Sequence, residues 1–220
     1  MTTTLTRTGP LRDAQQSPGV RWAPQAGMSS AAVFGSDDAQ RLQEAGIADL
    51  SFKRRAGAKG PGAAAWLQAQ GLPTPAQPNS WVRAECGSIV ARLGLTEYAV
   101  VAGPESGVHE QIVRNVPAGV YPVARYDAEL LLAGRQVHDL LKQTCAFDFE
   151  SLDPATRPVV MTSMVGVGVT VLAFGSPQQR YYRLWCDGTY GPYLWNTLVE
   201  VAGSLGGGAV GFEALGLMAR

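Results

Sequence analysis

The stretch ELLLAGRQVHDLLKQTC, residues 129–145, decides the fold that the sequence predicts. Its first part, ELLLAG, is apolar enough for a buried strand and closes on Gly134. Its second part places apolar or small residues at the spacing of one helix face, namely Val137, Leu140, Leu141 and Thr144. The stretch therefore predicts a strand, a glycine turn and a helix in succession.

The same order of elements occurs twice more along the chain. Residues 47–60, IADLSFKRRAGAKG, predict a strand pair or a curved strand, and PGAAAWLQAQG then predicts a helix with Pro61 in its first turn. Near the other end, YYRLWCDG alternates as a strand does, and a helix begins at Pro192 and runs to about residue 203. Leu140, Leu141, Leu194 and Trp195 are the residues expected in the core.

Other strands follow one another without a helix between them. Residues 88–93 and 97–102 are two such strands around a short turn, and VVMTSMVGVGVTVLAFG, residues 159–175, is a further β-rich run. We therefore expect an α+β fold with largely antiparallel sheets and short helices packed on one face.

Three segments are expected along the chain. Residues 1–30 lack helical or strand periodicity and predict a disordered arm or an arm that orders on a partner, with Trp22 and Pro24 as anchors. Residues 31–203 form the α+β domain. Residues 204–220 are glycine-rich and predict a flexible tail.

Composition excludes several classes of function. Hydrophobic residues make up 46% of the 220 residues and charged residues 16%, which favours a folded protein with surface covered by a partner. The formal net charge of +0 provides no general attraction to nucleic acid or anionic lipid. No apolar run reaches the roughly 20 residues of a membrane span, and no apolar stretch follows the basic residues near the first methionine. We expect a cytoplasmic protein.

Few residues are suited to catalysis or metal binding. His109 and His138 are the two histidines; His109 is expected in a polar loop and His138 on a solvated helix face. Cys86, Cys145 and Cys186 are widely spaced, which argues against a disulfide framework or a metal site and favours buried or half-buried thiols. No catalytic or metal-ligating residue is predicted.

Two groups of charged residues are candidates for binding. Glu97 and Arg125 flank predicted strands, and either could bind a small polar ligand. The second group is a basic cluster of Lys53, Arg54, Arg55 and Lys59. This cluster could hold an anion or an acidic partner, or it could be the solvent-exposed edge of a strand.

Taken together, four segments resemble the gamma subunit of heterotetrameric sarcosine oxidase. They are IADLSFKRRAGAKGPGAAAWL, IVARLGLTEYAVV, ARYDAELLLAGRQVHDLLKQTCAFDF and YYRLWCDGTYGPYLWNTLVEVAG. Their order carries more weight than any one of them, and they extend from about residue 47 to 203. That family is itself similar to the folate-binding fold of the aminomethyltransferase of glycine cleavage, whose catalytic aspartate and complete folate-binding set have no match here.

The resemblance implies a non-catalytic structural or assembly subunit of a multi-subunit oxidase or dehydrogenase acting on sarcosine or a related N-methyl amino acid. The partners would be larger flavoprotein subunits, and the complex would use FAD, FMN, NAD and tetrahydrofolate while this chain itself binds no cofactor. No GxGxxG follows any predicted strand, in agreement with this assignment. The alternative is a stand-alone tetrahydrofolate-binding protein or a folate-dependent methyl or aminomethyl transferase.

Overall fold

The computed structural model describes residues 7–104, 106–107, 110, 112, 116–176 and 178–219. The chain forms two compact units. Unit 1 comprises residues 1–52, 127–155 and 161–219, and unit 2 comprises residues 53–126 and 156–160 together with Arg220. One domain over 31–203 was expected; the middle of that range instead folds as a separate unit, because β5 to β9 form a sheet of their own.

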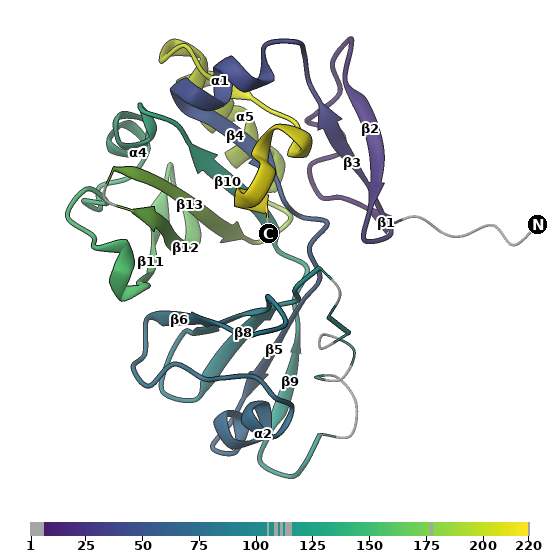
Figure 1. The fold of residues 1–220 in the computed structure, drawn as a ribbon, viewed down its shortest axis with the longest axis vertical. Helices are drawn as coiled ribbons and strands as arrows, with labels where there is room; N and C mark the ends of the chain where they lie inside the picture. The colour runs from purple at the N-terminus through teal and green to yellow at the C-terminus, as the bar shows by residue number, and fades with distance from the viewer. Residues whose placement is uncertain are drawn as a thin grey trace, which may run out of the picture. The chain divides into compact units, whose positions relative to one another are not determined.

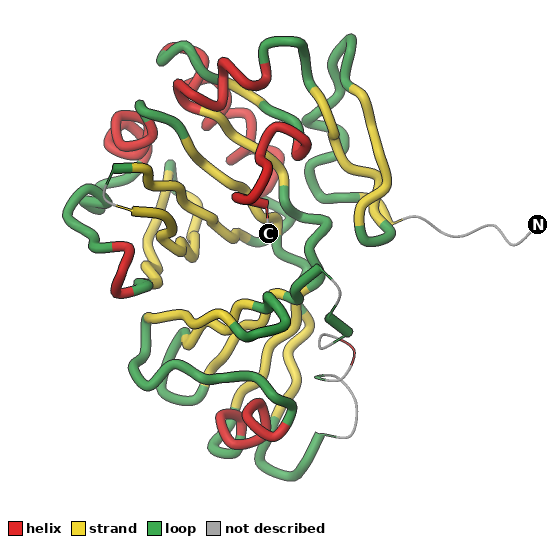
Figure 2. Tube along the Cα trace, viewed as in Figure 1, coloured by secondary structure: helices red, strands yellow, loops and turns green. Residues whose placement is uncertain are grey.

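The centre of unit 1 is a six-stranded sheet in the order β11-β12-β13-β10-β4-β14, shown in Figures 1 and 2. The pairings β12-β13, β13-β10 and β10-β4 are antiparallel, and β14 is parallel to β4. The bounds are β4 Gly46–Asp49, β10 Ala128–Ala133, β11 Val159–Met164, β12 Val167–Ser176, β13 Gln179–Cys186 and β14 Gly208–Ala209.

Helices cover one face of this sheet. Tyr182 on β13 contacts His138 of helix α4, with ring centroids 5.9 Å apart, so the face that carries Tyr182 and its cross-strand partner Leu132 faces α4. The predicted core residues on α4 and α5 are buried, as expected. The helices of this unit are α1 Asp38–Ala45, α4 Val137–Thr144 and α5 Gly191–Ser204, with short 3₁₀ turns η1 Pro154–Thr156 and η2 Phe212–Ala219.

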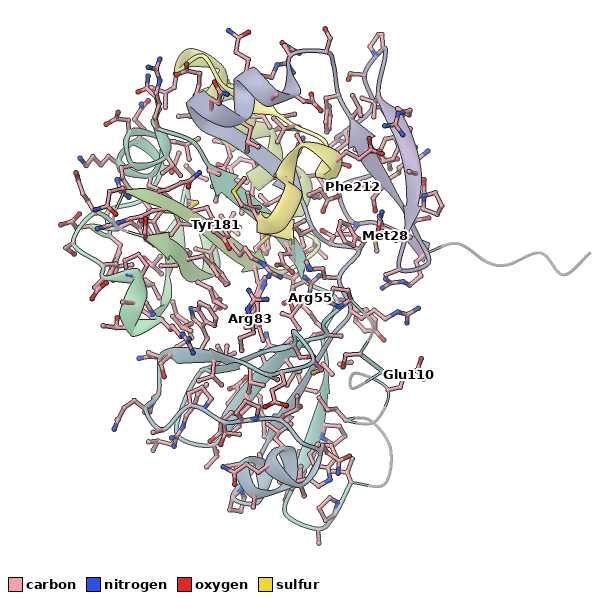
Figure 3. The ribbon with its side chains drawn as sticks, in the orientation of Figure 1. Met28, Arg55, Arg83, Glu110, Tyr181 and Phe212 are labelled. Carbon is pink, nitrogen blue, oxygen red and sulfur yellow. The ribbon has the colours of Figure 1, made fainter. Side chains whose placement is uncertain are left out.

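The opposite face of the same sheet holds a second apolar cluster. Leu131 on β10 packs there with Met28 and with Leu215 of η2, while Tyr181 and Phe212 lie partly buried against them (Figure 3). Both faces of the sheet are therefore buried at β4 and β10.

Unit 2 contains a five-stranded antiparallel sheet in the order β6-β7-β8-β5-β9, with helix α2 packed on one face. Trp66 and Leu67 of the helix pack against Tyr98 and Val100 of the sheet. The elements are β5 Arg55–Lys59, α2 Ala63–Ala69, β6 Ser80–Arg83, β7 Ile89–Arg92, β8 Glu97–Val101 and β9 Tyr121–Ala124. The predicted α+β class with largely antiparallel sheets is confirmed by the two units.

The prediction of a disordered arm over residues 1–30 is corrected for residues 7–30, and residues 1–6 lie outside the described part. A three-stranded sheet, in the order β1-β3-β2, occupies this segment, with β1 Arg7–Thr8, β2 Arg21–Gln25 and β3 Met28–Val33. Gln25 pairs with Met28, so β2 and β3 are joined by Ala26 and Gly27, both with positive φ. A two-residue turn of this kind matches the twist of a hairpin.

The prediction of a flexible tail over residues 204–220 is also corrected; Arg220 lies outside the described residues. Val210 is fully buried, and its N–H donates to the carbonyl of Ile47 at 2.9 Å. A Cβ on Gly207 would lie 2.1 Å from the carbonyl oxygen of Ala45, and one on Gly211 would lie 2.0 Å from that of Ala32. These glycines permit close backbone packing.

Candidate functional site

The predicted ligand residues Glu97 and Arg125 lie together in unit 2, and Lys59 joins them. Oε1 of Glu97 is 3.1 Å from Nζ of Lys59 and 3.3 Å from Nη2 of Arg125. One carboxylate oxygen thus faces two cations. We call these three residues the Glu97 cluster.

Strand register explains the Glu97 cluster. Lys59, at the end of β5, pairs with Glu97 at the start of β8, and Arg125 directly follows β9 on the other side of β5. A Cβ on Gly57 would lie 3.5 Å from Nε of Arg125 and 3.1 Å from Cβ of Val123. The absence of a side chain at residue 57 therefore leaves the space that Arg125 uses to reach Glu97.

The Glu97 cluster is suited to holding a negative charge. Its side chains are partly accessible, at 33% for Glu97, 16% for Arg125 and 48% for Lys59, and its formal charge is +1. Glu97 is engaged by both neighbouring cations. The arrangement can bind an anion, and it contains no nucleophile paired with a base.

Replacing Glu97 with glutamine should change the free energy of unfolding by less than about 1 kcal/mol, because partly exposed ion pairs contribute little. Urea unfolding measures the change, with Lys59→Gln as the control that breaks one ion pair instead of two. A loss of several kcal/mol would show that the Glu97 cluster holds unit 2 together.

The predicted basic cluster does not form one group of side chains. Lys59 belongs to the Glu97 cluster, while the carbonyl of Arg54 accepts the N–H of Ala102 at 2.9 Å. Arg55 instead shares a row of the sheet with Arg83, in the order Arg83, Ile89, Val101 and Arg55 across four strands. Figure 3 shows Arg55 and Arg83 on the same side of this sheet.

The basic residues nevertheless mark a charge difference between the units. Residues 53–126 and 156–160 contain nine Lys and Arg against four Asp and Glu. The remainder of the chain up to residue 219 contains eight against fourteen. The net charge of +0 therefore conceals a basic unit 2, and the anion or acidic-partner hypothesis for Lys53 and its neighbours stays a prediction.

Trp22, the predicted partner anchor, is engaged within unit 1. The guanidinium of Arg12 lies 3.6 Å from the centre of a Trp22 ring, and its Nη1 donates to Oγ of Ser29 at 2.7 Å. This cation–π contact orders the segment before β2. Binding of a partner by Trp22 stays a prediction.

Sequence reasoning missed a buried ion pair in unit 1. Glu129 on β10 and Arg183 on β13 are 0% and 1% exposed, and Nε of Arg183 donates to Oε1 of Glu129 at 2.5 Å. Glu129 lies directly opposite Trp185, which places it diagonal to Arg183 on the same face of the sheet. The signal was present as a charged residue within the apolar run of each strand, Glu129 beside LLLA in β10 and Arg183 between YY and LWC in β13.

Polar groups next to this pair are also hydrogen-bonded. Asp49 accepts from Nε2 of Gln15 at 3.0 Å and from the N–H of Ser51 at 2.7 Å. Oγ of Ser51 in turn accepts from the N–H of Glu129 at 3.1 Å. All four residues are buried. The group is suited to fixing the sheet, since a ligand could reach these carboxylates only by displacing existing partners.

His138 and Cys86 have different environments from those expected. His138 is partly buried, with Nε2 2.8 Å from the hydroxyl of Tyr182, so the expectation of a solvated histidine is wrong. Cys145 and Cys186 are buried as expected, but Cys86 is exposed. His109 lies outside the described residues.

Among the described residues, no His, Cys, Asp and Glu side chains gather as a metal site. In the same part of the chain, no helix is long and apolar enough to cross a membrane.

Comparisons with known proteins show the fold. The chain is similar to the glycine cleavage system aminomethyltransferase T from Bartonella henselae, with a TM-score of 0.71 and 16% identity over 94% of this chain. It spans 60% of that protein's chain. It is also similar to a chain of the heterotetrameric sarcosine oxidase from Corynebacterium sp. U-96, with a TM-score of 0.59 and 17% identity over 74% of this chain and 86% of that one. No family model and no curated protein sequence matches.

Proposed function

We propose that this chain is a non-catalytic structural or assembly subunit of a heteromeric oxidase or dehydrogenase acting on sarcosine or a related N-methyl amino acid. The observation that carries the proposal is the likeness to a chain of a heterotetrameric sarcosine oxidase. The aligned part is most of both chains, at 74% of this one and 86% of that one, so the two are of similar size.

The arrangement of the carboxylates supports the same proposal. Glu97 faces two cations, Glu129 is paired with Arg183, and Asp49 accepts two hydrogen bonds. A general base must be within hydrogen-bond reach of a substrate proton, and none of these three is presented in that way. We infer that the larger flavoprotein subunits hold FAD, FMN, NAD and tetrahydrofolate, and that the complex is cytoplasmic.

A second candidate function is binding of tetrahydrofolate by the chain alone, with or without methyl or aminomethyl transfer. The match to an aminomethyltransferase over 94% of this chain favours it. The Glu97 cluster is the candidate ligand site in that case, since Arg125 and Lys59 could bind a carboxylate of the ligand.

Coexpression tests the subunit proposal. A tagged form of this chain, produced with the flavoprotein subunits of an N-methyl amino acid oxidase from the same genome, should purify with them in a fixed ratio and with flavin absorbance. The chain produced alone should be colourless. Omitting the chain should lower the yield or the thermal stability of the remaining subunits, because they lose buried interface.

Titration with tetrahydrofolate separates the two candidates. We expect no heat of binding to the isolated chain, and the complex carrying both Glu97→Gln and Arg125→Gln should retain nearly full amine oxidation. Micromolar binding to the isolated chain that these two changes weaken at least tenfold would favour the second candidate, since charge-assisted contacts contribute about 1.5–3 kcal/mol. Failure of the chain to copurify with any flavoprotein would contradict the subunit proposal.

A further inference from the structure

A cavity of about 420 Å³ lies in unit 1 where α4 begins, whereas the Glu97 cluster belongs to unit 2. Residues of α1, of the loop between β10 and α4, of the start of β13 and of η2 line it. Its volume is within the roughly 300–1,000 Å³ of small-molecule sites. Neither the Glu97 cluster nor the buried Glu129–Arg183 pair contributes a residue to it.

The charged side chains around this cavity are cationic. Arg135 and Arg180 line it together with His138, and none of its lining residues is Asp or Glu. Arg135 is mostly exposed and pairs with Glu44. Among the described residues, Arg180 forms no ion pair, so its charge is the one that a ligand would meet without a direct counterion.

Arg180 is held in place by neutral acceptors. Its Nη1 donates to the carbonyl of Glu150 at 2.7 Å and to that of Phe149 at 3.4 Å. The carboxylate of Glu150 is engaged by Nζ of Lys142 at 2.5 Å. Carbonyl acceptors orient a guanidinium without neutralising it, so Arg180 is fixed before any ligand binds.

His138 is fixed beside Arg180. The hydroxyl of Tyr182 donates to the carbonyl of Phe149 at 3.2 Å. A hydroxyl has one proton, so the Tyr182 oxygen must accept in its hydrogen bond with His138, and Nε2–H of His138 is the donor. Burial lowers the pKa of His138, and so does the positive charge of Arg180, with Lys142 adding to it while Glu150 and Asp139 oppose. The imidazole is therefore neutral near pH 7, and Arg180 rather than His138 supplies the positive charge at this place.

We propose that this cavity binds a small organic acid, with Arg180 as the main counterion of the carboxylate. The apolar lining residues Leu42, Val137 and Met218 would contact the hydrocarbon part of the ligand. This apolar lining distinguishes the site from one for inorganic phosphate, which would leave these side chains unused. The site lies beyond the proposed subunit function and does not depend on it.

Benzoate titration of the full chain tests the proposal. The chain has two histidines, so the imidazole resonance of His138 is assigned by comparison with His138→Gln and followed by NMR. We expect benzoate to shift this resonance saturably and neutral benzamide to leave it unchanged. Arg180→Gln should weaken binding by about tenfold or more, because it removes a charge-assisted contact.

A matched pair of variants keeps the test valid if Arg180→Gln does not fold. Gln43 is exposed on α1 and lines the cavity, whereas Gln40 is exposed on the same helix and does not. Gln43→Glu adds a carboxylate at the cavity and should weaken benzoate binding several-fold, while Gln40→Glu should leave it unchanged. Equal effects of the two variants, no saturable shift, or binding of inorganic phosphate as tight as that of benzoate would overturn the proposal.

Discussion

Replacing Glu129 with alanine should lower the free energy of unfolding of unit 1 by about 3–5 kcal/mol, which is the usual cost of removing one partner of a buried ion pair. Arg183 is 1% exposed, and the substitution removes the carboxylate that accepts the hydrogen bond from its Nε. The guanidinium would then be a buried charge without a partner. A buried charge that is left without its partner is costly, which is why the expected loss is large. Urea unfolding followed by tryptophan fluorescence measures the loss.

Replacing both partners distinguishes the charge from the packing. Glu129→Leu combined with Arg183→Met removes both charges and keeps apolar volume in the sheet, so most of the stability lost in Glu129→Ala should return. Arg21→Gln is the control, because it breaks the Arg21–Glu213 ion pair on the exposed surface of the same unit. A double variant as unstable as Glu129→Ala would mean that hydrogen bonds of this pair, rather than an unpaired charge, determine the effect.

Leu141→Ala should lower the free energy of unfolding by about 2–5 kcal/mol, because it leaves a cavity where a buried leucine packed. Leu141 is buried on the face of α4 that also carries Leu140 and Thr144. If the chain is an assembly subunit, the same variant should also weaken its complex.

The matched control for this variant is Leu95→Ala. Leu95 is 78% exposed, so the same change of side chain should have little effect on stability. Thermal unfolding of the two variants beside the wild type gives the comparison. Similar losses in both would contradict the assignment of Leu141 to a closely packed core.

Sequence periodicity predicted the elements whose burial is local. In the stretch 129–145, the apolar run, Gly134 and the helical spacing are each visible in the sequence, and the structure explains the glycine. Gly134 has a φ of +118°, and a Cβ there would lie 2.4 Å from the carbonyl oxygen of Glu44. The helix face of Leu140 and Leu141 is likewise buried as predicted.

The segments near the two ends were missed because distant residues order them. Leu11 is fully buried, and a Cβ on Gly191, which is far along the chain, would lie 2.9 Å from its side chain. Gly211 donates its N–H to Asp38 at 2.9 Å, and the same carboxylate accepts from Phe34 and Gly35. The glycine-rich composition suggested a flexible tail. In the structure these glycines instead allow two backbone segments to pack closely together.

The candidate site was predicted as single residues and not as a group. Glu97 and Arg125 were both identified, but their meeting with Lys59 depends on the order β8-β5-β9 and on the empty position at Gly57. The Glu129–Arg183 pair depends in the same way on the register of β10 and β13. Register between strands is a property of the whole sheet, and local sequence patterns do not specify it.

The placement of β14 beside β4 sets the order of events during synthesis on the ribosome. Residues 53–126 supply all five strands of the sheet in unit 2, so this sheet can form while later residues are still being added. The six-stranded sheet of unit 1 is complete only after residue 210 has emerged, because Gly208 and Ala209 pair with β4 and Val210 donates to Ile47. The five-stranded sheet of unit 2 should therefore form before the six-stranded sheet of unit 1 is complete, although β4 of unit 1 is translated first.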